Sequence, residues 1–207
     1  IAHALAFNDQ QRSVLLMIDQ QNLDDHPYLK SLQDWAESPF EYVALMAGKS
    51  KGKKKLMERK ANFIRLQQLV DEFDFDVVAV GSDRRIEFQY VMHLLKQKQD
   101  KSVEGWYLDD GLYSYAGKPS RWYKDLANML AKKLTYGFWW QEPSTVGASE
   151  WITKAWLFDA KKAVPELNNK TTANIENRWF SHPAIKTFQT LVFSHYGLSE
   201  DKLAELE

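Results

Sequence analysis

The alternation of short apolar segments with longer segments of helical period constrains the fold more than any other feature of this chain. Five segments are short, rich in branched and aromatic residues and bounded by polar or turn residues, as buried strands are: residues 13–19, 42–47, 76–81, 105–109 and 155–158. Three segments between them space their apolar side chains at the helical period: residues 53–73, 84–98 and 120–134. The alternation predicts an α/β fold with a Rossmann-like, doubly wound parallel sheet and right-handed crossovers.

The chain is predicted to hold one domain and the start of another. Of its 207 residues 44% are hydrophobic, which is enough to bury one sizeable core. Residues 1–165 are expected to form a Rossmann-like N-terminal domain, and residues 1–7 look like the end of a helix whose preceding strand is missing. A polar, linker-like stretch covers residues 165–172. Residues 166–207 are predicted to hold most of this linker and the start of a truncated second Rossmann-like domain, with 188–194 as its first strand. The expectation is a fragment of a two-domain protein.

Charge and residue types exclude several classes of function. Lys and Arg number 27 against 28 for Asp and Glu, so the overall charge gives no reason to expect binding to nucleic acid or to an anionic membrane. The absence of cysteine excludes disulfides and thiolate chemistry and suits a cytoplasmic address. No apolar run approaches the roughly 18 residues that span a bilayer.

A basic cluster departs locally from the balanced charge. It covers residues 49–60, with the sequence Lys-Ser-Lys-Gly-Lys-Lys-Lys-Leu-Met-Glu-Arg-Lys. One interpretation is a solvated loop followed by the first turn of a helix. The other is a patch that binds phosphate or an anionic membrane, which would place the protein at the periphery of the inner membrane. The sequence leaves both open.

Two adjacent carboxylates are the leading candidates for chemistry. Ligands of open α/β sheets bind in the crevice outside the carboxyl ends of the strands. Asp109 and Asp110 stand at such a strand end, and Gly111 permits a sharp exit from it. A carboxylate in a cleft can take a proton from an attacking hydroxyl, so either is a candidate catalytic base. The alternative is a simple turn, because Asp-Gly is also a common β-turn dipeptide.

The end of the preceding predicted strand supplies a second group, Gly81, Ser82 and Asp83. Ser82 or Asp83 is expected to cap the next helix, and the backbone amides of this turn would point into the same crevice. These three residues, together with Gly111 and Ser114, are the predicted substrate contacts. Only one glycine is present in the turn, so neither a dinucleotide fingerprint nor a Walker loop fits it.

Other chemistries find little support in the sequence. The five histidines, at positions 3, 26, 93, 182 and 195, lack the spacing of a metal site, so no metal is predicted. There is no Gly-x-Ser-x-Gly elbow of a hydrolase. Trp139 and Trp140 are interpreted as packing residues of a core or domain contact, with stacking on a sugar or a base as the alternative.

The string Tyr107-Leu-Asp-Asp-Gly-Leu-Tyr-Ser-Tyr115 resembles the Asp/Glu-Asp/Glu-Gly motif of bacterial sialyltransferases and polysialyltransferases. These are inverting enzymes of the GT-B type, with two Rossmann-like domains. Gly81 and Ser82 one unit earlier, and residues 188–207, fit the layout of the N-terminal half of such an enzyme. The resemblance covers most of the chain in outline and is specific at the tripeptide that begins with Asp109.

The resemblance implies transfer of sialic acid, or a related nonulosonic acid, from a CMP-sugar donor to a cell-surface glycan such as lipooligosaccharide or capsule. Asp109 would be the base and Asp110 its neighbour, with the assignment between them open. No cofactor is implied beyond the donor substrate, and a homo-oligomer is left open. The family's second motif is His-Pro; His182 and Pro183 are interpreted as a helix start instead, so its counterpart is expected beyond Glu207.

Two alternatives accompany this interpretation. One is another GT-B transferase that moves a different sugar or a polyol phosphate. The other is a non-catalytic Rossmann-like interaction module, which would meet a partner through the region of Trp139 and Trp140 while the two aspartates form only a turn.

Overall fold

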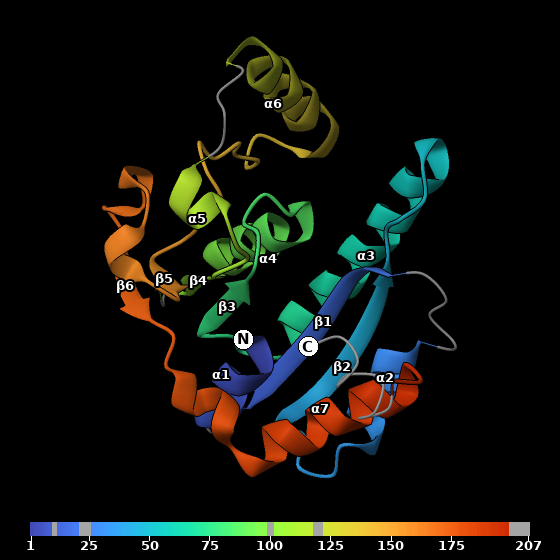
Figure 1. Ribbon diagram of the computed structural model, residues 1–207. Helices are drawn as coiled ribbons and strands as arrows, with labels where there is room; N and C mark the ends of the chain where they lie inside the picture. Colours follow the sequence, from blue (N-terminus) through green and yellow to red (C-terminus); the bar gives the residue numbers. More distant parts are fainter. Residues whose placement is uncertain (10–11, 21–25, 99–101, 118–121, 199–207) are drawn as a thin grey trace. The chain divides into compact units, whose positions relative to one another are not determined.

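The computed structural model describes residues 1–9, 12–20, 26–98, 102–117 and 122–198. Its elements are helices and parallel strands, so the predicted α/β class with parallel sheets is confirmed (Figure 1). Contacts divide the chain into two compact units, Ile1–Lys60 with Glu176–Glu207 and Ala61–Ile175. Helix α3 (Gly52–Glu72) crosses the division along the chain.

The first unit contains a two-stranded parallel sheet. Strand β1 (Ser13–Gln20) pairs with β2 (Phe40–Ala47), as the apolar pattern predicts. The other elements of this unit are α1 (Ala2–Asp9), α2 (Pro27–Asp34), the 3-10 helix η4 (Asn177–Ser181) and α7 (Pro183–His195). Its buried core joins α2 and α7 through Leu32, Trp35, Ala184 and Phe188.

Helix α7 corrects one prediction. Residues 188–194 were expected to form the first strand of a second domain, and they belong to α7 instead. Its inward-facing residues, Ala184, Phe188 and Leu191, recur at helical rather than strand spacing. The interpretation of His182 as a helix start is confirmed, because its ring Nδ1 accepts a hydrogen bond from the Ala184 amide at 3.2 Å. The proposed boundary near residue 165 stays a prediction.

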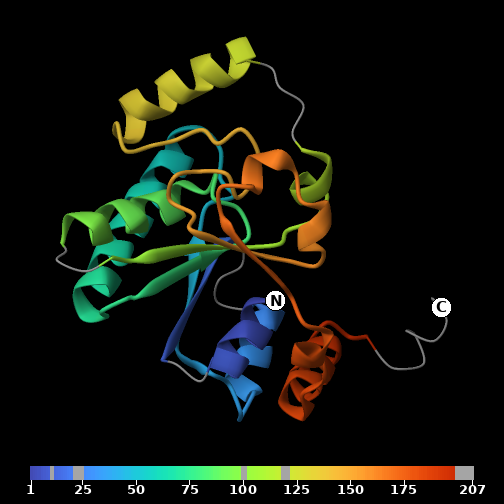
Figure 2. The same cartoon turned by 90° about the vertical axis from the view of Figure 1, so that its left-hand side faces the viewer.

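In the described residues of the second unit, four parallel strands follow one another in chain order across the sheet. They are β3 (Val77–Val80), β4 (Glu104–Leu108), β5 (Lys154–Leu157) and β6 (Thr171–Asn174), and neighbours along the chain pair in the sheet. Figure 2 shows β3 and β4 side by side. The order has no reversal, and the described pairings form two separate sheets, so the doubly wound arrangement stays a prediction.

The crossovers of the second unit are helical. They are α4 (Ile86–Gln97), α5 (Tyr113–Ala116), α6 (Trp122–Tyr136) and the 3-10 helices η2 (Ala160–Lys162) and η3 (Pro165–Leu167). The predicted long helices are confirmed with ends shifted by one or two residues; residues 120 and 121 of one of them lie outside the described residues, as do residues 199–207 of the predicted second domain. The predicted linker at 165–172 is wrong in part, because Thr171 begins β6.

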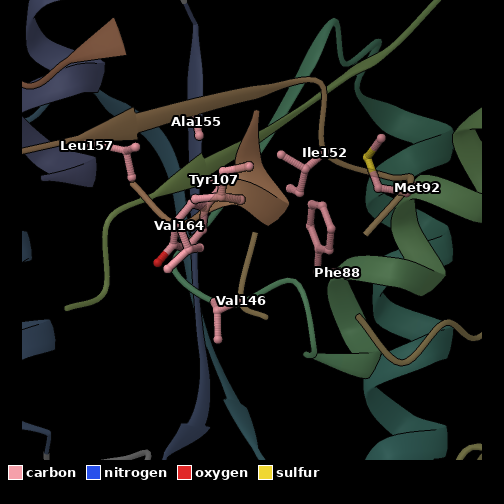
Figure 3. Packing of buried hydrophobic residues seen from close by; sticks show 9 residues of the cluster. Phe88, Met92, Tyr107, Val146, Ile152, Ala155, Leu157 and Val164 are labelled. Carbon is pink, nitrogen blue, oxygen red and sulfur yellow. The ribbon is translucent and has the colours of Figure 1, made fainter. Parts of the chain in front are cut away.

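The core of the second unit lies between α4 and the sheet (Figure 3). Phe88 and Met92 of α4 pack with Tyr107 of β4 and Ala155 of β5. Gly105 makes the close packing of this region possible, since a Cβ atom there would lie 1.9 Å from the backbone oxygen of Trp151. No helix within the described ranges is long and apolar enough to cross a membrane.

Gly105 and Gly81 provide a matched pair of substitutions. Gly105→Ala forces a methyl group against a backbone oxygen, so we expect it to lower the free energy of unfolding by about 3 kcal/mol or more. Gly81→Ala places its methyl group in ordinary contact, 3.6 Å from the nearest atom, and should cost less than about 1 kcal/mol. Urea denaturation measures both, and equal stability of the two variants would contradict the packing of β4.

Candidate functional site

The ends of β3 and β4 bring the two predicted groups of site residues together. Val80 at the end of β3 pairs with Tyr107 of β4, so the residues that follow both strands emerge at the same edge of the sheet. Gly81 comes to lie beside Asp110, since a Cβ atom on Gly81 would be 3.6 Å from Asp110 Oδ1. The two turns therefore lie side by side, and the prediction that they line one crevice stays a prediction.

Asp109 is buried, and both oxygens of its carboxylate accept hydrogen bonds from other residues of the fold. The side chain is only 6% exposed. Oδ1 accepts hydrogen bonds from the Gly111 amide at 3.1 Å and from Ser114 Oγ at 2.8 Å. Oδ2 accepts from the Phe158 amide at 3.1 Å and from the phenol of Tyr115. These bonds connect the ends of β4 and β5 with α5, which gives Asp109 a positioning role and leaves it little capacity to take a proton from a substrate.

Tyr115 belongs to the same network and was not predicted. Burial and its hydrogen bond to Asp109 raise the pKa of Tyr115 to about 12, so the phenol stays protonated and donates to the carboxylate. The phenol oxygen also accepts from the amides of Phe158 and Asp159, at 3.1 and 3.3 Å. Each backbone amide at the end of β5 thereby finds an acceptor.

Ser114 is fully buried, and its hydroxyl group belongs to the hydrogen-bond network that holds the turn. Its Oγ lies 2.7 Å from the phenol oxygen of Tyr107, which in turn accepts from the Asp110 amide at 3.3 Å. A chain of hydrogen bonds therefore runs from the Asp110 backbone through Tyr107 and Ser114 to Asp109. Direct contact of Ser114 with a substrate stays a prediction, and its burial does not favour it.

Asp110 is the exposed member of the pair. Its carboxylate makes no hydrogen bond or ion pair with any residue in the described part of the chain. Gly111 follows with φ of 121°, a conformation that favours glycine and turns the chain away from the strand. Leu112 and Tyr113 come next and are 81% and 55% exposed. Among the described residues, the edge thus presents the unpaired carboxylate of Asp110 beside exposed apolar surface.

Asp83 has a structural role, which corrects the prediction that it or Ser82 caps the next helix. The N-cap of α4 is Arg85, without a side-chain hydrogen bond. Asp83 is fully buried, and its two oxygens accept from the amides of Gly147 and Ser149 at 2.9 and 2.8 Å. Burial raises the pKa of Asp83, and the amide hydrogen bonds oppose that rise. Ser82 is half-buried, and contact of either residue with a substrate stays a prediction.

Trp139 and Trp140 pack within the second unit. Trp140 is fully buried. Trp139 stacks on His93, with ring centroids 5.7 Å apart, and lies against Tyr90. These contacts support the interpretation of the two tryptophans as packing residues. A pocket of about 640 Å³ lies beside them, and none of the predicted site residues lines it.

Comparisons with protein-family models, with curated proteins and with solved structures find no match for this chain. Within the described ranges, no group of three or more His, Cys, Asp or Glu side chains is arranged to hold a metal ion.

The two aspartates should differ sharply in their effect on stability. Asp109→Asn puts an amide group among four hydrogen-bond donors, and we expect the free energy of unfolding to fall by about 2–3 kcal/mol. Asp110→Asn changes an exposed side chain that is unpaired with any described residue, and it should stay within about 0.5 kcal/mol of the original protein. Chemical denaturation monitored by tryptophan fluorescence measures both values. Similar losses in the two variants would contradict the division of roles.

The phenol of Tyr115 should lose its proton at a higher pH than an ordinary tyrosine does. Its folded-state pKa is raised from 10 to about 12, so its contribution to stability is complete below pH 10 and is lost as the pH rises through 12. A spectrophotometric titration of tyrosinate, taken as the difference between the original protein and Tyr115→Phe, should show one phenol ionising near pH 12. Ionisation near pH 10 would contradict both the burial of the phenol and its hydrogen bond to Asp109.

Proposed function

We propose that this protein is an inverting glycosyltransferase in which Asp110, rather than Asp109, is the catalytic base. The substrate class is a CMP-activated sialic acid or related nonulosonic acid, transferred to a hydroxyl group of a cell-surface glycan. One observation carries the choice of base: the Asp110 carboxylate is exposed and unpaired with any described residue, while that of Asp109 is held by four donors.

In the proposed step, an acceptor hydroxyl donates a hydrogen bond to the Asp110 carboxylate. The hydroxyl oxygen attacks the anomeric carbon from the face opposite the leaving group, and its proton passes to Asp110. The bond between the anomeric carbon and the phosphate oxygen breaks, and CMP leaves with the electron pair. Attack from the opposite face inverts the configuration at that carbon. General-base help of this kind contributes about 10²–10⁴-fold in rate.

The residues around Asp110 suit this role. Gly81 lacks a side chain where it faces the carboxylate, which leaves room for an acceptor hydroxyl. The backbone amide of Asp110 is bound to Tyr107, so the base sits on a fixed support. Asp109 contributes indirectly, because it fixes the turn from which Asp110 projects. Preorganisation of this kind lets a catalytic group act without rearrangement.

Asp110→Asn in the full-length protein should reduce kcat by about 100-fold or more, because the amide cannot accept the proton. The assay follows transfer of sialic acid from its CMP conjugate to a soluble oligosaccharide. Glu104→Gln is the matched control, since this exposed carboxylate lies at the opposite end of β4, and its activity should stay within about two-fold of the original. Unchanged turnover in Asp110→Asn would exclude Asp110 as the base.

A further inference from the structure

The segment that leads into α3 concentrates positive charge on the surface. Between residues 49 and 60 stand six lysines, here called the lysine patch: Lys49, Lys51, Lys53, Lys54, Lys55 and Lys60. None of them forms an ion pair with a residue in the described ranges. The acidic residue of the segment, Glu58, accepts a hydrogen bond from Ser50 Oγ at 2.5 Å. The patch therefore keeps a strong positive charge.

The stability of α3 does not explain these lysines. Three of them, Lys53, Lys54 and Lys55, lie in the first turns of the helix, where the positive end of the helix dipole repels cations. No acidic residue in the first turn offsets this repulsion. An anionic surface placed against this end would be attracted both by the lysines and by the dipole.

Apolar side chains stand among the lysines on the outer face of the helix. Met57 is 70% exposed and Leu56 is 42% exposed. Lys53, Met57 and Lys60 recur at helical spacing and share one face. Asn62, a buried residue of α3, follows Lys53 by nine residues, which is two and a half turns at 3.6 residues per turn, and so points the opposite way. Met57 is therefore exposed on the face of α3 that lies away from Asn62.

We propose that the lysine patch, with Met57 and Leu56, docks the protein on an anionic membrane surface. Lysines bordering an exposed apolar pair match the two contributions of an interfacial anchor: attraction to acidic headgroups, and insertion of apolar side chains at the headgroup boundary. A nucleic-acid surface would make no use of Met57 and Leu56, and it is met more commonly by arginine than by a run of lysines. This docking is independent of the sugar-transfer step at Asp110.

Co-sedimentation of the full-length protein with vesicles tests the proposal. The protein should bind vesicles that contain phosphatidylglycerol and should not bind vesicles of phosphatidylcholine alone. Each lysine near an anionic surface strengthens binding about five-fold, so the triple variant Lys53→Gln, Lys54→Gln, Lys55→Gln should bind about 100-fold more weakly. The matched control replaces three lysines elsewhere, Lys161, Lys162 and Lys186, with Gln and should keep its binding.

A second variant separates the apolar contribution from the charge. Met57→Ser should weaken the part of the binding that persists at high salt, and both it and the lysine triple variant should keep the thermal stability and the turnover on a soluble acceptor of the original protein. Equal binding to neutral and anionic vesicles, equal losses in the control triple variant, or binding of DNA without binding of vesicles would each overturn the proposal.

Discussion

The carboxylate of Asp109 is the interaction on which the rest of the proposed site depends. Four donors converge on it, from the turn at Gly111, from Ser114 and Tyr115 of α5, and from the amide of Phe158 at the end of β5. A buried charge without such partners would be costly, so the carboxylate and its donors hold one another in place. Strand pairing alone brings β4 and β5 together. The hydrogen bonds of Asp109 also fix the conformation of the turn that follows β4, and the side chain of Asp110 projects from this turn.

A difference in burial gives the neighbouring residues Asp109 and Asp110 different roles. Asp109 and Asp110 are chemically identical and adjacent in sequence, yet one stabilises the turn and the other is exposed to solvent. Asp83, which follows the preceding strand β3, has a similar structural role, because it is buried and accepts hydrogen bonds from the amides of Gly147 and Ser149. Within the described part of the chain, two buried carboxylates therefore organise this edge of the sheet, and the carboxylate of Asp110 is exposed beside them.

Much of the fold could be predicted from the sequence, and the missing parts have physical causes. Five strands and three long helices follow from apolar spacing, because strands and helices bury side chains at different periods. The prediction of a strand at residues 188–194 was wrong because a short apolar run suits a strand as well as a helix. The buried helical face becomes recognisable only when Ala184 is considered together with Phe188. Strand β6 was not predicted, because its residues are mostly polar and exposed and lack the apolar pattern of a buried strand. The sequence placed Gly81 and the aspartates at one edge, but it could not show which aspartate is free, since Phe158 lies 49 residues away from Asp109.

Donor binding is the sharpest test of the proposed transferase activity, because an enzyme with a catalytic base but no activated sugar has nothing to transfer. The measurement is calorimetric titration of CMP and of its sialic acid conjugate into the full-length protein and its Asp110→Asn variant, with UDP as the control nucleotide. We expect both proteins to bind the cytidine compounds and neither to bind UDP, since the proposed role of Asp110 is to act on the acceptor rather than on the nucleotide. Preference for UDP would contradict the assignment of the donor, and absence of all nucleotide binding would contradict the assignment as a transferase.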